Sequence, residues 1–506
     1  MKSLKVTKSF QVLFCFAIFL VAFVTRFYGL ELKPIHFDES INGWFVMQMK
    51  LNGFYKYDPN NYHGPLYFYL LQLLEFFWGT SLRVLRTLPT IFSIATVMLF
   101  LWGWARTTAW NLWVLFFILV SPAFLFFGRS GIHEMPFVFF QICFALGVMR
   151  WLGTQKDARA LALILVGLFG VVTLKETFAI LLVASAVGFL SLGFSELKKI
   201  FDSQSVREAW NRRLTIWSIL LLLLFFGLFS GFGRNPQGIA DFVNAFLPWM
   251  KTGAHGHGHE KEFLYWVKTM AEAEPLALAG VVLAFWGVLT SDRSLRWISV
   301  VGLVQLLIYS LIPYKTVWCI LSLVWPFYFV LASYVERAWR GPRSVKITAL
   351  FIVILGTVLQ GQSAWRAVYK EPLDLAHPYV YVNSTHESQK ISAIFLKALV
   401  DHPEISQQVW QVGADEQWPW PWVLRHVQSL NFTLCHDRIV ADAIVYICKE
   451  DRQTQVESQL KESYYKFVLP LRQHQADSVI YLKSAIFAPY MSATEEQVGP
   501  GKEVAP

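Results

Sequence analysis

The sequence predicts an α-helical polytopic membrane protein with about eleven transmembrane helices, followed by a small C-terminal α/β domain. Two observations predict this fold class. Hydrophobic residues make up 55% of the 506 residues and charged residues only 16%, whereas a soluble domain carries about 25% charged residues. Apolar runs of bilayer length recur as far as residue 362 and then stop. Nucleic acid is not expected as a partner, because the net charge of +9 comes from short basic clusters between these runs, as in loops beside anionic membrane lipid.

The predicted spans lie in the membrane part, residues 1–362. They fall near residues 10–28, 84–104, 111–128, 136–152, 159–174, 177–194, 214–232, 275–290, 296–312, 316–334 and 346–362. The first run follows lysines, as a signal peptide does, but it is long and lacks a cleavage site of small residues, so we predict that it is retained. The run 66–78 is shorter than the roughly 17–25 residues that cross a bilayer, and we predict an interfacial helix there.

The distribution of Lys and Arg predicts the orientation. With 66–78 lying flat, the basic clusters all fall in cytoplasmic loops, as the positive-inside rule requires. With 66–78 as a further span, every later cluster would move outside. We therefore expect a multi-pass protein of the plasma (inner) membrane. Its first outer loop 29–83, its long outer loop 233–272 and its C-terminal domain would be extracytoplasmic.

Residues 363–491 change in composition and predict the α/β domain. Strands are expected at 379–382, 408–412, 431–435, 443–448, 465–470 and 478–482, and helices at 389–400 and 452–462. The polar tail 492–506 is predicted to be disordered.

Two features of this domain allow more than one interpretation. Cys435 and Cys448 flank neighbouring predicted strands; we expect two buried free thiols, with a disulfide in an oxidising compartment as the alternative. The segment 418–422 alternates tryptophan with proline. It would form a sugar-stacking surface or the hydrophobic contact that seats the domain on the membrane part, and the sequence favours neither.

Asp38 and Glu39 follow the first span directly. Carboxylates at a membrane boundary are costly and are more often functional than ordinary surface charge. On a helix adjacent side chains diverge by about 100°, so we expect only one of the two to meet a substrate. A partly desolvated carboxylate can act as a general base. The alternative is a salt bridge at a helix start.

Other polar residues are predicted on the same outer face. His63 precedes Gly-Pro at a predicted helix start, where it is either a structural cap or a neighbour of an anion. Arg129 could bind a phosphate in a bidentate manner. Glu134 supplies another carboxylate, and His133-Glu134 is not a metalloprotease motif because residue 137 is Phe. The predicted substrate-binding set is His63, Arg129, His133, Glu134, Lys175, Glu176 and Lys315.

Two of these segments keep an alternative. Lys175-Glu176 is either an ion pair that satisfies itself or a phosphate-binding cation held by its neighbour. His255, His257 and His259 alternate with glycine and could bind a transition metal. A mobile loop is favoured there, and such mobility would suit a lid over a substrate site.

The ordered set of motifs resembles the GT-C glycosyltransferase superfamily. The set is a span, Asp38-Glu39, a His-Gly-Pro helix opening, and Arg129 with Glu134 after the third span. The superfamily includes protein O-mannosyltransferases, aminoarabinose transferases and oligosaccharyltransferase catalytic subunits. Segments 55–59, 63–66, 175–176, 313–316 and 418–422 are more closely similar to the archaeal and bacterial family labelled "flippase activity-associated". This resemblance covers most of the chain.

The resemblance implies a sugar donor on a polyprenyl phosphate, reached from the outer leaflet. Asp38 would deprotonate an acceptor hydroxyl, giving inversion, and Glu39 and Glu134 would position the acceptor or a divalent metal ion. Arg129, Lys175 and His63 would stabilise the leaving phosphate. Members of the superfamily often have Asp where this chain has Glu134, and His133 is an addition, so metal use stays open. The metal-ligand candidates are Asp38 with Glu134, or His255, His257 and His259.

Two further functions compete with the transferase. One is a non-catalytic accessory protein in the flipping of lipid-linked sugars for cell-surface glycosylation, as the family label suggests. A flippase needs a polar path across the membrane, whereas the polar groups here gather at one predicted face, which favours the enzyme. The other is a solute transporter, which is less favoured because no inverted repeat is evident. The sugar and the acceptor, whether glycan, lipid or protein, are not identified by the sequence.

Overall fold

The computed structural model describes residues 8–104, 109–154, 157–255, 258–473, 477–492 and 496–499. The chain forms two compact units. The helical unit contains Met1–Leu32 and Val46–Tyr379, and the C-terminal unit contains Lys33–Phe45 and Val380–Pro506. The boundary therefore falls inside one helix, α2 (Phe37–Asn52). Residues 33–45, which the sequence placed with the membrane part, belong to the C-terminal unit.

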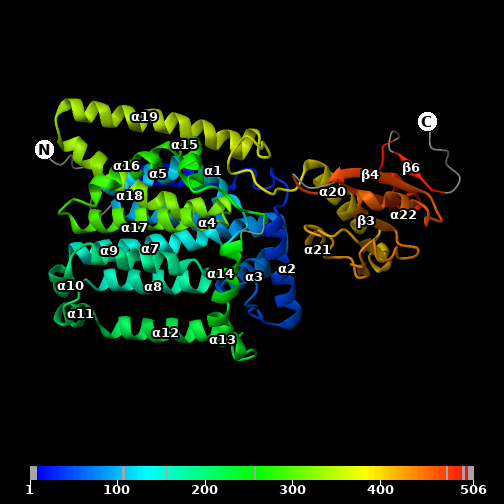
Figure 1. Ribbon diagram of the computed structural model, residues 1–506, viewed down its shortest axis with the longest axis horizontal. Coiled ribbons are helices and arrows are strands. Elements are labelled where there is room, and N and C mark those ends of the chain that lie inside the picture. The colour runs from blue at the N-terminus through cyan, green and yellow to red at the C-terminus, as the bar shows by residue number, and fades with distance from the viewer. Residues whose placement is uncertain are drawn as a thin grey trace. The chain divides into compact units, whose positions relative to one another are not determined.

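Long apolar helices make up the helical unit and run side by side in Figure 1. Each predicted span overlaps one of them, and in the run 111–128 Pro122 starts a second, short helix of 5 residues. These helices are α1 (Lys8–Phe27), α4 (Leu82–Trp104), α5 (Ala109–Val120), α6 (Pro122–Phe126), α7 (Glu134–Gly153), α8 (Ala158–Leu174), α9 (Phe178–Leu190), α12 (Arg212–Phe229), α16 (Pro275–Gly287), α17 (Arg293–Leu311), α18 (Ile320–Arg340) and α19 (Arg343–Trp365).

The helices show a multi-pass membrane protein. Among the described residues, 6 helices are long and apolar enough to cross a bilayer, or 8 if each of two bent pairs is one span. Shorter apolar helices include Gln11–Phe27, Ala158–Leu174 and Pro275–Gly287. The count of about eleven spans stays a prediction. Helix α3 (Leu66–Trp78) has 13 residues, about 20 Å at 1.5 Å per residue, which is short of the roughly 30 Å hydrocarbon core.

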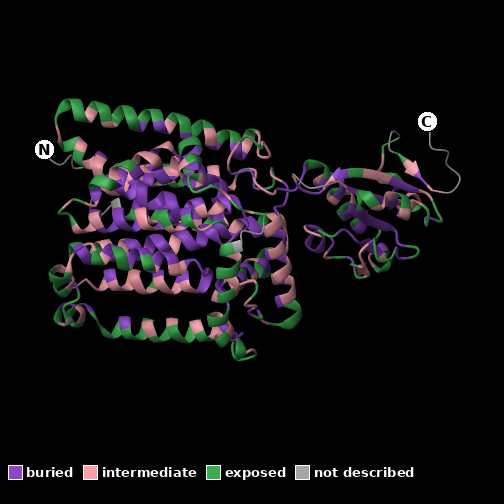
Figure 2. Cartoon of the chain, in the orientation of Figure 1, coloured by how far each residue is buried: buried purple, intermediate pink, exposed green. Residues whose placement is uncertain are grey.

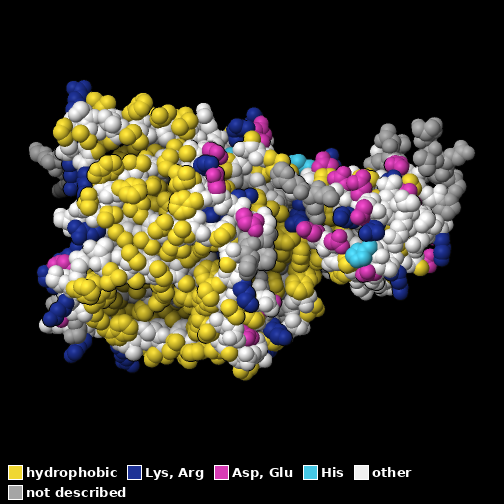
Figure 3. All heavy atoms as spheres, viewed as in Figure 1, with side chains coloured by type: hydrophobic (Ala, Val, Ile, Leu, Met, Phe, Trp, Pro, Cys, Tyr) yellow, Lys and Arg dark blue, Asp and Glu magenta, His cyan; other side chains and the backbone are white. Residues whose placement is uncertain are grey.

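Burial differs strongly between the long helices (Figure 2). In α7 and α18, 72% and 78% of the most apolar window is buried, whereas in α12 and α19 only 17% is. The exposed sides of α12 and α19 carry large apolar residues such as Leu223 and Phe351, and apolar side chains cover much of the visible face of the helical unit in Figure 3. Exposed apolar surface of this extent belongs in lipid.

Short helices connect the long ones. They are α10 (Phe194–Ile200), α11 (Ser203–Ala209), α13 (Gln237–Asn244), α14 (Phe246–His255) and α15 (Tyr265–Ala273), with the single turns η1 (Phe127–Arg129), η2 (Val317–Cys319) and η3 (Arg366–Lys370).

Basic side chains gather at one end of α7, where it meets the starts or ends of its neighbours. Arg150 in its last turn pairs with Asp157. The hydroxyl of Ser294 at the start of α17 donates to the Met149 carbonyl (3.1 Å). Arg337 in the last turn of α18 pairs with Asp292, the residue before α17 (2.8 Å). The predicted site residue Glu134 starts α7. The basic loops and Glu134 therefore lie at opposite ends of this helix.

The C-terminal unit holds one six-stranded sheet in the order β2-β1-β3-β5-β4-β6. Strand β1 is parallel to β2 and β3, and the other pairs are antiparallel. The strands are β1 (Trp410–Val412), β2 (Leu430–Asn431), β3 (Val445–Lys449), β4 (Tyr464–Pro470), β5 (Asp477–Lys483) and β6 (Gln497–Val498). The helices and turns are α20 (His386–Asp401), η4 (Pro403–Gln407), α21 (Trp420–Val423), η5 (Glu450–Arg452), α22 (Gln453–Glu457), α23 (Ser484–Phe487) and η6 (Ala488–Tyr490).

Four predictions for this unit were wrong. Residues 379–382 form no strand, because Val382 has a φ of 52°. The isolated β-bridges nearby belong to the two residues that follow, Asn383 with His36 and Ser384 with Arg472. The helix predicted at 452–462 ends at Glu457. Part of the tail predicted to be disordered forms β6, which pairs with β4. The fourth error is the state of the two cysteines.

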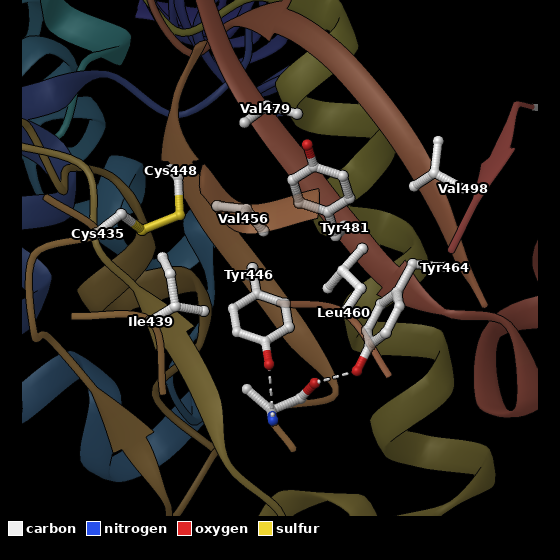
Figure 4. Close-up of a cluster of buried hydrophobic side chains, with 11 residues drawn as sticks. Cys435, Ile439, Tyr446, Cys448, Val456, Leu460, Tyr464, Val479, Tyr481 and Val498 are labelled. Carbon is white, nitrogen blue, oxygen red and sulfur yellow. Dashed lines mark hydrogen bonds between the residues drawn. A yellow bond between two sulfur atoms is a disulfide. The ribbon is translucent and has the colours of Figure 1, made fainter. Parts of the chain in front are cut away.

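Cys435 and Cys448 form a disulfide, with their Cα atoms 5.8 Å apart, and are not the free thiols that we expected. Both are fully buried in an apolar cluster that also contains Tyr446 and Tyr464 (Figure 4). The two tyrosines hold Ala443: its N–H donates to the Tyr446 hydroxyl (3.2 Å), and the Tyr464 hydroxyl donates to its carbonyl (2.7 Å). The disulfide therefore lies inside a buried apolar cluster in which the backbone N–H and carbonyl of Ala443 are hydrogen-bonded.

Candidate active site

The Glu39 carboxylate caps the start of helix α2. Its Oε2 accepts a hydrogen bond from the backbone N–H of His36 (2.8 Å), and the side chain is fully buried. His36 is the residue before the helix and Glu39 its third residue, so this bond is the carboxylate half of a capping box. The His36 ring also accepts from the N–H of Asp38 (3.1 Å). These bonds satisfy N–H groups that a helix start leaves unpaired.

Asp38 has a different environment from its neighbour. Its carboxylate is 31% exposed and lies 3.9 Å from Nδ1 of His36. Arg472 is near enough for the Asp38 charge to act on it, although burial is the larger effect and lowers the pKa of Arg472. The Arg472 guanidinium stacks over the Phe37 ring at 4.5 Å and pairs with Glu416. Of the two adjacent carboxylates, Asp38 is thus the one that solvent or a substrate can reach.

The tryptophan segment packs on the helix start that carries Asp38. The Trp418 ring lies 6.4 Å from Phe37 and 6.1 Å from Trp44, in edge-to-face contacts. A Cβ added to Gly43 would lie 2.1 Å from Nε1 of Trp422, so only glycine allows this approach. The segment therefore has a packing role inside the C-terminal unit.

His36 completes this support. Its Nε2 lies 2.9 Å from the Tyr381 carbonyl, and its backbone pairs with Asn383. Burial lowers the pKa of His36, so the ring is held neutral. A neutral ring can accept from the Asp38 N–H through Nδ1 while Nε2 donates to Tyr381.

A buried ion pair joins α7 and α8 in the helical unit. Lys175, the residue after α8, pairs with Glu134, the first residue of α7, and their side chains are 7% and 5% exposed. Burial alone would lower the pKa of Lys175, but Glu134, with smaller contributions from Cys319 and Glu176, holds it well above the usual value. Lys175 is therefore charged, and its partner is Glu134 and not the adjacent Glu176.

Glu176 instead meets His63, with Oε2 3.1 Å from Nδ1. The loop that carries His63 is fixed to the end of α8, where the N–H of Gly64 donates to the Leu174 carbonyl (3.0 Å). A Cβ on Gly64 would lie 2.1 Å from the backbone oxygen of Thr173. The glycine of the His-Gly-Pro motif is thus required by this close approach.

His133 lies between these groups. Its ring centroid is 4.0 Å from that of Tyr67 and 4.8 Å from that of His63. Nε2 is buried and has no hydrogen-bond partner in the part of the chain that the structure describes. Burial, with His63 and Lys175 nearby, lowers the pKa of His133 well below its usual value. The ring is therefore neutral and has one nitrogen unused.

Two predicted cations are used within the protein. Arg129 is 7% exposed and donates to the carbonyls of Thr25 (2.9 Å) and Gly29 (2.8 Å) at the end of α1. Lys315 is 2% exposed and donates to the carbonyls of Lys261 (3.0 Å) and Ile312 (2.6 Å). Burial lowers the pKa of Lys315. Both geometries favour a structural role over direct binding of a phosphate.

The metal candidates do not form a site among the described residues. No group of three or more His, Cys, Asp or Glu side chains there could hold a metal ion. His257 and the side chain of His255 lie outside the described residues, and the His259 ring packs 5.1 Å from that of Tyr314. Metal dependence stays a prediction, and no chemical step is assigned to a metal.

Sequence reasoning missed one buried carboxylate, Glu274. It is fully buried, and its oxygens accept five hydrogen bonds, from Ser121, the N–H of Ala123, Tyr328, Gln360 and Tyr379. Two of these donors lie at the break between α5 and α6. A Glu-Pro pair directly before an apolar run was the available signal, because an acidic residue there must find partners inside the bundle.

Solved structures similar to this chain were found, although no protein-family model matches it and no curated protein matches its sequence. The crystal structure of ArnT from Cupriavidus metallidurans bound to undecaprenyl phosphate aligns with a TM-score of 0.62. It covers 94% of this chain and 98% of ArnT, at 11% identity. The chain has the GT-C fold. Apo ArnT from the same organism gives a TM-score of 0.60, also at 11% identity.

The similarity to ArnT confirms the predicted fold class. Almost the whole of both chains aligns, so the similarity includes the C-terminal unit as well as the helices. At 11% identity it establishes the fold and leaves the residue roles to chemistry. The closer resemblance to the flippase-associated family stays a prediction.

Proposed function

We propose that this protein is a membrane glycosyltransferase that moves a sugar from a polyprenyl-phosphate donor to an acceptor hydroxyl on the extracytoplasmic face. The observation that carries the proposal is the difference in burial between two neighbouring carboxylates at the start of α2. Glu39 is buried and caps the helix, while Asp38 is 31% exposed. A reactive carboxylate on a rigid helix start suits a general base. The GT-C fold and the lipid phosphate bound to ArnT support the donor class.

In the proposed reaction Asp38 accepts the proton of the acceptor hydroxyl. The acceptor oxygen then forms a bond to the anomeric carbon as the bond between that carbon and the phosphate oxygen breaks. The leaving polyprenyl phosphate takes the electron pair. Attack from the face opposite the phosphate inverts the anomeric centre.

Stabilisation of the leaving phosphate falls to Lys175, His133 and His63. Lys175 is charged, and the Nε2 of His133 is unused. Preorganised donors and charges of this kind act on the charge that develops in the transition state. Glu134 holds Lys175 in place and His63 is held by Glu176. We assign Arg129 and Lys315 to positioning, because both are bound to backbone carbonyls.

Two observations support an extracytoplasmic site. The C-terminal unit contains a disulfide, and disulfides persist mainly in oxidising compartments outside the cytoplasm. Basic loops lie at the end of α7 opposite to Glu134, and the positive-inside rule places such loops in the cytoplasm. The localisation that follows is the plasma (inner) membrane, with the site facing outwards.

The test is an Asp38→Asn variant reconstituted in proteoliposomes with a labelled polyprenyl-phosphate sugar. Loss of a general base is expected to lower the transfer rate by about 10²–10⁴-fold, with unchanged unfolding temperature. Glu272→Gln removes an exposed carboxylate and serves as the matched control at wild-type rate. An unchanged rate in Asp38→Asn would refute the base. If the wild type transfers no sugar but its deletion stops movement of lipid-linked sugars, the accessory role in flipping replaces the proposal.

A further inference from the structure

A small cavity lies beside Glu176, on the side of the loop 57–64 and helices α12 to α14. Its volume is about 10 Å³, close to the ~10–15 Å³ that one water needs. Five aromatic residues line it together with Glu176. They are Tyr57, Tyr62, Phe229, Phe242 and Phe246, and the remaining lining residues are Gly64, Val172 and Ala245. The rings pack tightly, with centroid distances of 4.9 Å between Tyr57 and Phe229 and 4.7 Å between Phe229 and Phe242.

Glu176 brings a negative charge to this cavity. Its side chain is 5% exposed, and Oε2 meets His63. Within the described part of the chain, no hydrogen bond reaches Oε1. This oxygen is not among the fully enclosed atoms and is therefore open to a hydrogen-bond donor from a small ligand. No Lys or Arg is among the lining residues.

Further negative charge surrounds the aromatic wall. Besides burial, the charges of Glu176, Asp241 and Asp58 raise the pKa of Tyr57. Aromatic rings add to such a potential, because the face of a ring attracts a cation. An anion would be repelled, so the cavity differs in kind from a phosphate site.

The loop that closes the cavity is held in an unfavourable conformation. Tyr62 has a φ of 46°, a left-handed backbone that is unfavourable for a tyrosine. The adjacent Gly64 is fixed to the end of α8, as described above. Strain of this kind persists where the surrounding structure imposes it, and it is concentrated at ligand-binding sites.

We propose that this cavity binds a primary ammonium group, with Glu176 Oε1 accepting its hydrogen bond and the aromatic rings surrounding its charge. The size argues for this group, because –NH₃⁺ is about as large as one water, whereas a trimethylammonium group is several times larger. The ammonium would come from a lipid headgroup amine or from a water-soluble amine. The inference does not require the proposed sugar transfer, but it shares Glu176, which holds His63 in the proposed reaction; binding is therefore measured apart from transfer.

The experiment uses the full chain in nanodiscs of phosphatidylglycerol, which carries no amine. Unfolding temperature is measured against methylammonium, tetramethylammonium and sodium chloride at equal ionic strength. We expect a saturable rise with methylammonium only, since a ligand that binds the folded state stabilises it. Equal effects of methylammonium and either of the other salts would overturn the proposal.

Variants locate the binding. Glu176→Gln keeps the shape and removes the charge, and Phe242→Leu removes one ring; each should weaken methylammonium binding about tenfold or more. Glu272→Gln, an exposed carboxylate outside the cavity, should bind like the wild type. Wild-type binding in both cavity variants would show that the cavity holds only water and would overturn the proposal. If Glu176→Gln does not fold, Phe242→Leu decides by itself.

Adding phosphatidylethanolamine to the nanodiscs identifies the source. Loss of the methylammonium effect would mean that the lipid amine already fills the cavity. Its persistence would mean that the ligand is a water-soluble amine. Both results presuppose methylammonium binding and therefore support the site.

Discussion

The Lys175–Glu134 pair gives the sharpest prediction about stability. Both side chains are more than nine-tenths buried, so removing one partner leaves a charge without compensation inside the helical unit. Such a change costs about 3–5 kcal/mol. We expect Lys175→Met and Glu134→Gln each to lower the free energy of unfolding by this amount. The exposed pair Lys268–Glu262, 58% and 57% exposed, is the matched control; Lys268→Met should cost about 1 kcal/mol or less.

The double variant separates the pair from its surroundings. If the two changes were independent, their costs would add to roughly 6–10 kcal/mol, which is comparable to the whole stability of many proteins, about 5–15 kcal/mol. Because the double variant buries no unpaired charge, we expect it to recover most of this loss. Equilibrium unfolding of the four proteins in detergent measures the coupling. Single costs below about 1 kcal/mol, or additive costs in the double variant, would refute the reasoning.

Two further predictions concern the helix start that carries Asp38. Gly43→Ala places a Cβ 2.1 Å from Nε1 of Trp422 and should lower the free energy of unfolding by about 1–3 kcal/mol, measured by tryptophan fluorescence. The control Gly153→Ala adds a Cβ that meets nothing within 4 Å and should be as stable as the wild type. Equal effects of the two changes would contradict the packing of Trp422 on Gly43. Burial lowers the pKa of His36. Below about pH 6.5 the unfolded state therefore binds more protons than the folded state, and the free energy of unfolding decreases as the pH is lowered. His36→Gln should flatten this fall in unfolding measured across pH 4–8 (roughly the range in which histidine titrates), and an unchanged slope would show that His36 is not its source.

The sequence predicted the helices well because hydrophobicity alone decides which segments enter a bilayer. The runs near 136–152 and 296–312 became α7 and α17 with small changes at their ends. The break at Pro122 was not predicted, since a proline inside an apolar run can kink a helix or end it. The short strands were harder, because β6 has only two residues and depends on pairing with a distant strand.

The site shows a similar division. Asp38 and Glu39 were correctly expected to point in different directions, because helix geometry fixes the angle between neighbours. Partners distant in sequence were not predictable: Lys175 was paired with Glu176 or with a phosphate, yet it meets Glu134. Arg129 and Lys315 were predicted to bind substrate, but both donate to backbone carbonyls: Arg129 at the end of α1, and Lys315 after α17 and in the loop before α15. The sequence around a residue does not show which backbone carbonyls of distant segments its side chain will bind.

The division of α2 between the two units has a consequence for building chimeras. Residues 33–45 belong to the C-terminal unit, and the start of α2 is held by Tyr381, Asn383, Trp418 and Trp422. A chimera that exchanged only the residues after 379 for those of another chain with this fold would separate the helix start from the surface that supports it. An exchangeable module must therefore contain two stretches of chain, one near each end of the sequence.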